Sequence, residues 1–597
     1  MTSKFENPAI IVLSQASIPV AEEIKSRCGG EVHGLRGRVA KSDVVFDTAA
    51  HHVANLFNEG RFIIGIMASG ALIRLLAPHI GDKLTDPPVL SVADDGSSVV
   101  PLLGGHHGGN EMARILSGHL GGHAAITTAG DIRFGIALDD PPTGWLLANP
   151  DNAKPVMAAL LGGAHVRIGG GLVNQAGWLR NSELPFSLTG DVLLTIDESS
   201  ADADPLELVY CPQNLVLGVG CERGVALDEL NQLLDSCDIN IEAISCIATI
   251  DLKADEVAVN QLAEELGVPV RLFTADELEQ ETVRLANPSD VVFEEVGCHG
   301  VAEGAALAAV GAVGVLHLAK QKSKRATMAI GRAPQPIDCS RVGRSRGHLS
   351  VVGIGPGAAD WRSPEVTQLI SAASELVGYS LYLDLLGDLT DAKTRHDFDL
   401  GKEEDRVRHA MELAGQGHNV ALVCSGDAGI YAMATLVYEL LESGGLSDAA
   451  QRISIQVSPG ISALQAAAAR AGAPLGHDFC TISLSDLLTP WEAIEMRVKA
   501  AAEGDFVVAF YNPVSKRRRT QLAYAKDVLL QHRPKDTPVI LATNLGREGE
   551  QVRIIPLGEL NIDDVDMLTV VIVGSSDTRT VTTGDGRSWA FTPRGYA

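Results

Sequence analysis

Short apolar runs followed by segments of helical periodicity recur along the whole chain. Residues 10–13 and 62–66 are two such runs, and each has the length and flanks of a buried strand. The clearest series is strand 215–219, helix 227–234, strand 243–249, helix 255–266 and strand 270–273. Strands that alternate with helices predict parallel sheets covered by helices, so we expect an α/β, multidomain fold.

The same pattern divides the chain into five segments. We expect domains over 1–150, 213–320 and 348–597, a middle or connector region over 151–212, and an exposed linker over 321–347. The linker is predicted because this stretch is rich in Lys, Arg, Pro and Ser and shows no apolar periodicity. The Gly- and Ala-rich stretch 300–319 predicts a closely packed buried helix rather than a membrane span.

Composition and charge exclude several classes of protein. The 597 residues carry a formal net charge of −27, which argues against a nucleic-acid partner. The nine cysteines are scattered without a CxxC pair, so neither a disulfide framework nor a zinc site is predicted. No leader or membrane segment is recognised, and we expect a cytoplasmic protein. A polycarboxylate ligand would have to be attracted locally, for example by the four consecutive cations at 516–519.

A glycine-rich turn follows the predicted strand at 349–353. The turn contains Gly353, Gly355, Pro356 and Gly357. By itself it is a weak signal, because such turns bind dinucleotides or phosphates, or merely connect a strand to a helix. A dinucleotide fingerprint would have a third glycine where Ala358 stands, and Pro356 lacks a backbone donor for a pyrophosphate.

Four further motifs lie at the ends of predicted strands, at 423–431, 457–463, 508–513 and 541–548. In open α/β sheets ligands bind at the carboxyl ends of the strands, so these motifs should converge on one crevice. Together with the glycine turn they resemble the class III tetrapyrrole methyltransferases. The segments 425–431, 485–491 and 511–513 are most similar to the precorrin-3B C17-methyltransferases.

This resemblance implies a two-lobed fold with S-adenosylmethionine in the cleft between the lobes. The residues that would surround the cofactor are Gly426, Asp427, Ile430, Tyr431, Ser462, Ala463, Tyr511, Asn512, Thr543 and Asn544. The turn Gly353, Gly355, Pro356 and Gly357 would border the tetrapyrrole, and Lys516 and Arg517 would hold its carboxylates. The family also implies a homodimer formed through this domain, and C17-methylation coupled to contraction of the ring.

Each of these residues also has a simpler structural interpretation. Asp427 could cap a helix, Tyr431 and Tyr511 could be core residues, and the cations at 516–519 could form a solvated helix face. A methyl transfer from a sulfonium needs alignment and an apolar wall more than a strong acid or base. A site made of glycines and backbone contacts is therefore chemically adequate.

The N-terminal half contains an unusual concentration of glycine and histidine. Four histidines and Glu111 fall within 106–123, which first indicates a metal site. However, the glycines around His106 and His107 predict a loop, and no helical metal-binding spacing such as HExxH is present. We therefore predict no metal and favour acid/base chemistry or contacts to substrate carboxylates.

Two regions of this half resemble the cobalt-precorrin-5A hydrolases. The first region contains the motifs Ser69-Gly70, Thr85-Asp86-Pro87, Asp94, Gly104-Gly105-His106 and Asn110-Glu111, and the second contains 217–224, 293–297 and Ala302-Glu303. His107-Gly108 stands where the family has Leu-Gly. The resemblance implies lactone opening with release of acetaldehyde, which needs a base to deliver water. We expect His106 and Glu111 in the acid/base roles, followed by Asp94 and Glu294, although glycine–histidine turns and surface glutamates are often only structural.

The sequence thus predicts N-terminal α/β hydrolase-like domains followed by a two-lobed class III tetrapyrrole methyltransferase. We expect a bifunctional enzyme that acts on precorrins or cobalt-precorrins. One alternative is a methyltransferase with a non-catalytic tetrapyrrole-binding N-terminal module. Another is methylation at a different ring position or of ribosomal RNA, against which the net charge of −27 and the segment 485–491 both argue.

Overall fold

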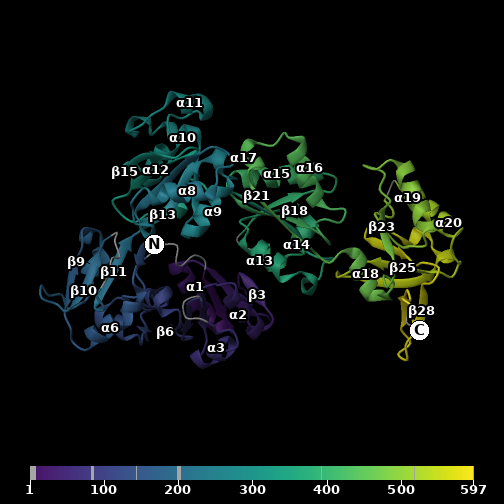
Figure 1. Ribbon diagram of the computed structural model, residues 1–597. Helices are drawn as coiled ribbons and strands as arrows, with labels where there is room; N and C mark the ends of the chain where they lie inside the picture. Colours follow the sequence, from purple (N-terminus) through teal and green to yellow (C-terminus); the bar gives the residue numbers. More distant parts are fainter. Residues whose placement is uncertain are drawn as a thin grey trace. The chain divides into compact units, whose positions relative to one another are not determined.

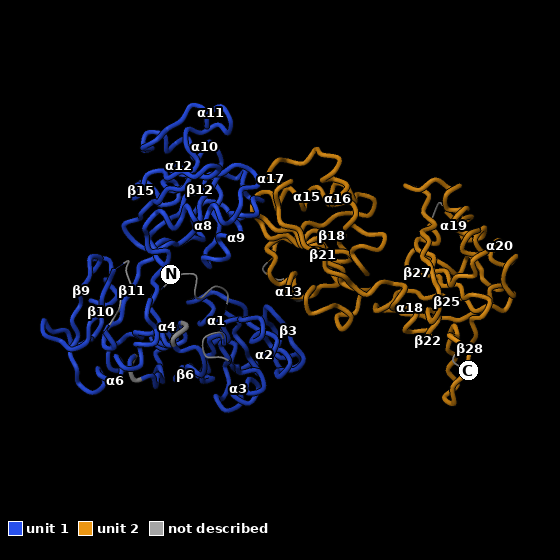
Figure 2. The backbone as a smooth tube through the Cα atoms, viewed as in Figure 1, with its two compact units in different colours: residues 1–346 blue, residues 347–597 orange. Residues whose placement is uncertain are grey.

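The computed structural model divides the chain into two compact units, Met1–Arg346 and Gly347–Ala597 (Figure 2). The structure describes residues 8–81, 86–142, 144–197, 204–390, 393–515 and 518–595. Figure 1 shows that each unit is built from separate sheets with helices packed against them. Within the described residues, no helix is both long and apolar enough to cross a membrane.

The first sheet of the N-terminal unit has seven strands. In spatial order they are β3 (Val44–Phe46), β2 (Glu31–Leu35), β1 (Ala9–Val12), β4 (Ile63–Ile66), β5 (Val89–Val92), β6 (Ser98–Leu103) and β7 (His123–Ala124). The first five are parallel, and β6 is antiparallel to β5. All four residues of β1 are buried, which is typical of a strand covered on both faces.

Helices cover both faces of this first sheet. They are α1 (Ile18–Cys28), α2 (Ala49–Asn58), α3 (Ser69–Leu76) and α4 (Asn110–Leu120). Ile10 and Val12 pack with residues of α1 and α4, whereas Ala9 and Ile11 pack with residues of α2 and α3. The alternation along one strand therefore supplies two cores at once.

The middle region forms a sheet with a core of its own. Its strands, in spatial order, are β8 (Trp145–Leu147), β11 (Glu207–Pro212), β10 (Val192–Ile196) and β9 (Val166–Gly169). The helices α5 (Ala129–Phe134), α6 (Ala153–Leu161) and α7 (Gly177–Arg180) belong to this region. Because β8 lies before residue 150, the sheet begins earlier than the predicted connector 151–212.

The third sheet contains the strand–helix series predicted from the sequence. Its strands, in spatial order, are β14 (Val270–Phe273), β13 (Ile244–Ile250), β12 (Leu215–Cys221), β16 (Ala326–Arg332) and β15 (Val315–Lys322). Its helices are α8 (Leu227–Asp235), α9 (Val257–Leu266), α10 (Ala275–Glu279), α11 (Asp290–Val296) and α12 (Val301–Val310). Eight of the ten residues of α12 are buried, as predicted for the Gly- and Ala-rich stretch 300–319, but residues 315–319 of that stretch belong to β15 and not to a helix.

The predicted linker 321–347 is not an exposed linker in the structure. Strand β16 lies between β12 and β15, and its residues Ala326, Met328 and Ile330 are buried in the core. Beyond it, the Arg344 backbone exchanges two hydrogen bonds with Leu272 of β14. The surrounding Lys, Arg and Pro residues masked this two-residue alternation, which is itself a strand signal.

The C-terminal unit begins with a five-stranded parallel sheet. Its strands, in spatial order, are β19 (Thr394–Phe398), β18 (Glu375–Tyr379), β20 (Asn419–Cys424), β17 (His348–Gly353) and β21 (Ser454–Ser458). Its helices are α13 (Pro364–Ala372), α14 (Ser380–Asp384), α15 (Glu403–Gly415), α16 (Met433–Ser443) and α17 (Asp448–Gln451). The carboxyl ends of β17 and β20 lead into the glycine turn and the 425–431 motif, so the parallel order brings these two motifs together.

A second, mixed sheet forms the other lobe of this unit. Its strands, in spatial order, are β23 (Phe479–Ser483), β24 (Val507–Tyr511), β27 (Thr569–Val573), β25 (Pro538–Thr543) and β26 (Gln551–Pro556). The helices α19 (Trp491–Glu503) and α20 (Thr520–Leu529) cover one face. The other face carries α18 (Ala463–Ala471) and a small sheet of β22 (Gly472–Ala473), β28 (Arg579–Thr582) and β29 (Ser588–Phe591).

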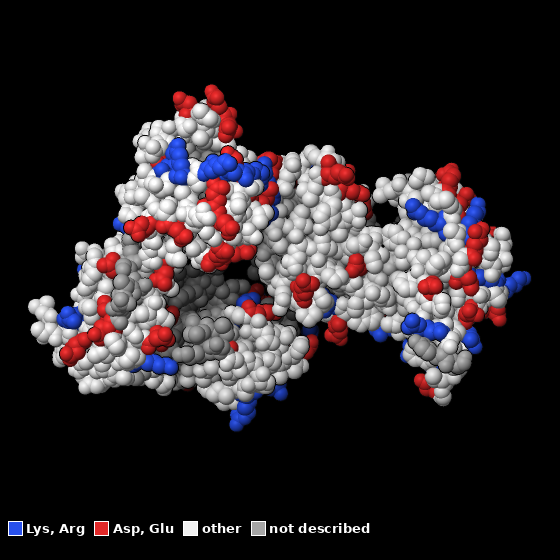
Figure 3. All heavy atoms as spheres, in the orientation of Figure 1, with Lys and Arg blue, Asp and Glu red and all other residues white. Residues whose placement is uncertain are grey.

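Charged side chains on the face seen in Figure 3 lie in small groups. Lys and Arg side chains are interspersed with Asp and Glu, and much of this face carries neither. An anionic ligand approaching this face of a protein with a net charge of −27 therefore depends on individual cations rather than on one broad basic surface.

Candidate functional site

The C-terminal unit contains a cavity of about 350 Å³. Both lobes contribute to its wall, which comprises Pro356, Tyr382, Leu400, Glu403, Arg406, 423–427, 430–433, Ser462, Ala463, Tyr511, Asn512, Ala542, Asn544, Leu545, Arg547 and 567–570. Its volume lies in the range of small-molecule sites, which is about 300–1,000 Å³. Most lining groups are apolar or neutral, and Asp427, Glu403, Arg406 and Arg547 are the charged ones.

Three glycines allow the loops behind this cavity to touch through their backbones. A Cβ atom added to Gly460 would lie 2.1 Å from the Gly426 carbonyl oxygen and 2.5 Å from that of Gly353. Gly355 and Gly426 exchange backbone hydrogen bonds of 3.1 and 2.8 Å. A Cβ atom at Gly353 or Gly460 would push the loops apart, and Gly426 has φ = 70°, so this floor requires glycine at all three positions.

Asp427 fixes two of these loops. One carboxylate oxygen accepts a hydrogen bond from the Gly429 amide at 2.8 Å, and the other accepts one from the Gly460 amide at 3.1 Å. The side chain therefore ties the end of β20 to the end of β21. Its charge is directed at backbone donors, and the residue acts as a positioning group that shapes the cavity.

The cavity wall also contains three residues in the left-handed backbone region. Tyr431 has φ = 53°, Asn512 has φ = 49° and Asn544 has φ = 53°. Asparagine tolerates this region, but for tyrosine it is uncommon and costs free energy. Among the described non-glycine residues, only Asp238 and Asp505 share this conformation. Strained residues that gather in one place indicate a functional site.

Aromatic rings form one side of the cavity. The centroids of Tyr431 and Tyr511 lie 5.1 Å apart. The Tyr431 hydroxyl donates to the Thr481 carbonyl at 3.1 Å, and the Tyr511 hydroxyl accepts from the Leu464 amide at 3.2 Å. Burial raises the pKa of Tyr511, so this phenol stays neutral and offers an aromatic wall rather than a base.

Arg547 joins the two lobes across the cavity. Its Nε donates to the Pro356 carbonyl at 2.7 Å, and its Nη2 donates to the Ser425 hydroxyl at 2.9 Å. Burial lowers the pKa of this guanidinium. Pro356 and Ser425 both belong to the first lobe, whereas Arg547 follows β25 of the second. The hydrogen bonds thus hold the glycine turn against the second lobe.

In the N-terminal unit, polar groups collect at the carboxyl ends of β1, β4 and β5. The Ser17 hydroxyl donates to Asp94 at 2.7 Å. Ser69 donates to the Ser91 hydroxyl at 3.1 Å, and Ser91 donates to the Met67 carbonyl at 2.7 Å. Asp94 itself is exposed. This edge is where an open parallel sheet usually binds a ligand.

Glu111 lies on the other side of the same sheet, near the amino ends of its parallel strands. Strand β6 runs antiparallel to β5 and pairs Leu103 with Val89, so it ends at the amino ends of the parallel strands. There the backbone of Gly105–Gly109, including His106 and His107, forms a π-helical turn that leads into α4. Glu111 is exposed in the first turn of α4, and its far end at Leu120 lies against Gly96. The length of α4 puts Glu111 and Asp94 about 15 Å apart along the helix axis.

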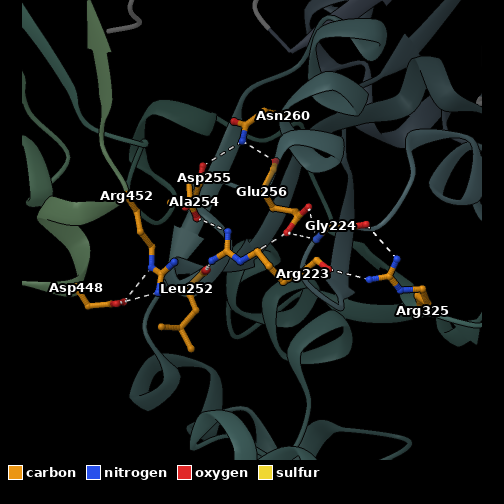
Figure 4. Close-up of polar contacts among 10 residues, drawn as sticks. All are labelled: Arg223, Gly224, Leu252, Ala254, Asp255, Glu256, Asn260, Arg325, Asp448 and Arg452. Atoms are coloured by element: carbon orange, nitrogen blue, oxygen red, sulfur yellow. Dashed lines mark hydrogen bonds and ion pairs between the residues drawn. The ribbon is translucent and has the colours of Figure 1, made fainter. Parts of the chain in front are cut away.

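The third sheet has its own polar network at the carboxyl end of β12 (Figure 4). Arg223 donates to Asp255 at 2.6 Å and to the Leu252 carbonyl at 2.7 Å. The Gly224 amide donates to the buried Glu256 at 3.1 Å. Arg325 donates to the carbonyls of Arg223 and Gly224 at 2.8 and 3.0 Å. The turn after Cys221 is therefore held rigidly, and its charged groups are already paired.

Glu303 and Glu294 differ sharply in their surroundings. Glu303 is 1% exposed and accepts four hydrogen bonds, from the amides of Ala286, Asn287 and Lys320 and from the Asn287 side chain. Burial alone would raise the pKa of Glu303, but these donors outweigh it and lower the pKa. Glu294 is exposed on α11 in the third sheet's region. No interaction that the structure describes connects Glu294 to Asp94 or Glu111.

Three family models match the chain. Residues 348–561 match the tetrapyrrole (corrin/porphyrin) methylases, 215–331 match "Cobalamin synthesis G C-terminus" and 51–131 match "Cobalamin synthesis G N-terminal". Over 251 residues the chain is 43% identical to the precorrin-3B C(17)-methyltransferase of a Sinorhizobium species, covering 42% of this chain and 98% of that protein. This chain belongs to the tetrapyrrole methylases.

Other similar proteins also match the methylase part. A probable cobalt-factor III C(17)-methyltransferase of Salmonella typhimurium is 45% identical over 248 residues, covering 42% of this chain and 99% of that protein. The solved structure of the methyltransferase CobJ is 39% identical and covers 41% of this chain and all of that one, with a TM-score of 0.39. The chain thus joins the two cobalamin synthesis G domains to a tetrapyrrole methylase.

The methylase cavity collects most of the predicted cofactor residues. Gly426, Asp427, Ile430, Tyr431, Ser462, Ala463, Tyr511, Asn512 and Asn544 all line it. Thr543 does not, since its hydroxyl lies 2.8 Å from that of Thr569, which lines the cavity in its place. Within the predicted turn, Pro356 lines the cavity, whereas Gly353, Gly355 and Gly357 lie behind it.

Several of the predicted site residues fall outside the described part of the chain. Lys516 and Arg517 lie there, as do Thr85 and the side chains of His106 and His107. The structure does describe the two cations that follow, and both already have partners. Arg518 donates to the Ser485 hydroxyl at 2.9 Å, and Arg519 pairs with Asp563 at 2.5 Å. Among the side chains that the structure describes, no three His, Cys, Asp or Glu residues lie together in a group that could hold a metal ion.

Part of the methylase cavity wall was not predicted from the sequence. Tyr382, Arg406, Arg547 and 567–570 line the cavity but were not predicted. Arg547 follows Gly546 in the motif 541–548, which was expected to lie at the cleft, so its place in the cavity wall could have been predicted. Arg406 lies inside a helix of ordinary amphipathic pattern, and nothing in the sequence distinguishes it from the charged residues beside it.

Proposed function

We propose that the C-terminal unit binds S-adenosylmethionine in the 350 Å³ cavity and methylates C17 of a tetrapyrrole, precorrin-3B or its cobalt analogue, with contraction of the ring. The observation that carries this proposal is the floor of Gly353, Gly426 and Gly460. It lets the loops that follow β17, β20 and β21 meet backbone to backbone behind the cavity. The high identity to the C17-methyltransferases over nearly their whole length supports it.

The cavity fits the cofactor in its chemistry. When bound, S-adenosylmethionine supplies a methyl group on a sulfonium, and transfer requires the acceptor carbon to lie in line with the methyl–sulfur bond. The rings of Tyr431 and Tyr511 and the chain at 567–570 offer apolar surface that excludes water. The loops after β20 and β21 border the cavity at Gly426, Ser462 and Ala463. Asp427 keeps these loops in position.

A binding and turnover experiment tests this function. Purified full-length protein should bind S-adenosylhomocysteine with one site in calorimetry. With precorrin-3B or cobalt-factor III, it should give a product heavier by one methylene unit. Comparison of the two substrates decides which form is natural. A protein that binds neither the cofactor product nor a tetrapyrrole would refute the proposal.

We further propose that the N-terminal unit opens the lactone of cobalt-precorrin-5A and releases acetaldehyde. The two family models that match 51–131 and 215–331 support this activity. Two groups of candidate residues lie at opposite ends of the strands of the first sheet: Asp94 with its serine neighbours, and Glu111 with the π-helical turn. The reacting lactone would therefore bind at one of these ends and not at both. Sheet topology favours the carboxyl ends of the strands, where Asp94 lies.

Acetaldehyde release from cobalt-precorrin-5A, measured anaerobically, tests the second activity. Asp94→Asn should abolish release if the carboxyl edge is the site, and Glu111→Gln should abolish it if the π-helical turn is the site. Release that survives both changes would move the reaction to the third sheet, near Glu294. If the wild-type protein releases no acetaldehyde but still methylates, the N-terminal unit is a binding module.

A further inference from the structure

A buried arginine faces the cavity with most of its hydrogen-bonding capacity unused. Arg406, on helix α15, is 2% exposed and belongs to the cavity wall. Its Nη2 donates to the Asp399 carbonyl at 3.1 Å. Its Nε has no partner among the described residues, and no acidic side chain there pairs with it. A guanidinium has five N–H donors, so this one is far from satisfied.

Another buried arginine of the same unit shows what a structural role looks like. Arg533 is 5% exposed and donates to the carbonyls of Gly574, Ala501 and Phe506. Its Nε, which like that of Arg406 has no hydrogen-bond partner among the described residues, lies 3.5 Å from the Asp505 carboxylate. Arg533 thus joins three chain segments and neutralises its charge. Arg406 does neither, although burying an unpaired charge is costly.

The cavity is the place where the missing partner of Arg406 would bind. The other cavity arginine, Arg547, is already used to hold Pro356 and Ser425. Glu403, one helical turn before Arg406, also lines the cavity, but its carboxylate accepts from the Gly401 amide at 3.3 Å. Around them, Tyr382, Leu400 and Cys424 form a wall of low polarity. There a charge-assisted hydrogen bond is stronger than in water.

We propose that Arg406 binds a carboxylate of the ligand held in this cavity. The inference rests on the proposed methyl transfer, because both participants carry carboxylates. One source is the methionyl carboxylate of S-adenosylmethionine, and the other is an acetate or propionate side chain of the tetrapyrrole. A planar guanidinium suits either, because it can donate two parallel hydrogen bonds to a carboxylate.

Substitutions of Arg406 in the full-length protein test this assignment. Arg406→Gln removes the charge, and Arg406→Lys keeps it but loses the paired geometry. Arg408→Gln is the matched control, because Arg408 lies on the same helix and pairs with Glu404 and the Gly445 carbonyl. Each variant is measured for its unfolding temperature, its affinity for S-adenosylhomocysteine and its KM for the tetrapyrrole at saturating cofactor.

The two sources of the carboxylate give different results. If the cofactor supplies it, Arg406→Gln lowers the S-adenosylhomocysteine affinity about 10- to 100-fold. In that case an analogue without the carboxylate binds wild type and variant equally. If the tetrapyrrole supplies it, the cofactor affinity is unchanged and the KM rises by a similar factor. In both cases Arg406→Lys shows a smaller effect and Arg408→Gln none.

The inference is overturned if folded Arg406→Lys and Arg406→Gln keep both the cofactor affinity and the KM of the wild type. Should Arg406→Gln fail to fold, Arg406→Lys alone decides, since it preserves the buried charge. Failure of the proposed function is distinguishable: wild type and Arg408→Gln would then show no cofactor binding and no methylation, whatever stands at position 406.

Discussion

At the scale of single residues, the methylase cavity depends on side chains that bind the backbone. Asp427 holds the Gly429 and Gly460 amides, and Arg547 holds the Pro356 carbonyl. The sequence singled out Asp427 because it is the one charge in a glycine-rich motif. It did not single out Arg406, because burial of an arginine in a tertiary cavity leaves no trace in local periodicity.

Replacement of Asp427 by asparagine should loosen the cavity floor. The amide keeps one acceptor oxygen but presents N–H groups to a backbone donor, so one of the two hydrogen bonds is lost. Because hydrogen bonds to charged groups contribute about 1.5–3 kcal/mol, we expect the affinity for S-adenosylhomocysteine to fall about 10-fold or more in calorimetry. Asp448→Asn is the control, since Asp448 pairs only with Arg452 on the surface of the same lobe in the described contacts. An unchanged affinity would show that the two amides do not need the charge.

A pair of histidines should make the N-terminal unit sensitive to acid. His33 is 3% exposed, and its Nδ1 lies 2.8 Å from His52 Nε2. Burial, together with the charges of His52 and Arg61, lowers the pKa of His33 from 6.5 to about 3. The unfolded chain therefore takes up a proton below pH 6.5, whereas the folded chain does not until about pH 3. The contribution of this group to stability is complete above pH 6.5 and is lost as the pH falls towards 3.

The expected loss from His33 alone is about 3 kcal/mol between pH 7 and pH 4. Chemical unfolding of the fragment 1–346 at a series of pH values measures it. His33→Leu should flatten this pH dependence, while His51→Gln, which changes an exposed neighbour, should leave it intact. A His33→Leu profile as steep as that of the wild type would assign the acid sensitivity to other groups.

At the scale of elements, the sequence predicted best where periodicity was undisturbed. The strand expected at 270–273 is β14, and the helix expected at 227–234 is α8 with one residue more. The linker expected at 321–347 was wrong because charged neighbours concealed β16. The separation of Glu111 from Asp94 could not be predicted either. It arises because β6 runs antiparallel to β5, and the direction of a strand within a sheet is a tertiary property.

The contact between β17, β20 and β21 should not tolerate one added methyl group. In Gly460→Ala the new carbon would lie 2.1 Å from the Gly426 carbonyl oxygen, so the loops must separate. We expect a loss of about 1–3 kcal/mol in the free energy of unfolding and a loss of cofactor binding. Gly584→Ala is the control, because no atom lies within 4 Å of its added carbon. Thermal unfolding and calorimetry measure both effects, and equal behaviour of the two variants would contradict the proposed packing.

At the scale of the whole molecule, the two units should be separable at residue 347. Gly347 already belongs to the methylase, since the Ser454 amide donates to its carbonyl at 2.9 Å and an added Cβ would lie 1.6 Å from the Ala414 oxygen. We expect the fragment 347–597 to fold alone and to bind S-adenosylhomocysteine within about threefold of the full-length protein, because every residue that lines the cavity belongs to this unit. Circular dichroism and calorimetry test this. A fragment that is unfolded, or folded without affinity, would show that the methylase needs the N-terminal unit.

The inner position of β16 has a consequence for synthesis of the chain. The third sheet keeps an unpaired edge at β12 until residues 326–332 have left the ribosome, because no earlier strand occupies that edge. An edge strand with unpaired backbone groups and apolar side chains is a template for association with other chains. Composition alone would place the end of a domain near residue 320. A protein truncated there would keep the unpaired edge of β12 permanently exposed. Only a chain that continues past Arg332 can hide it.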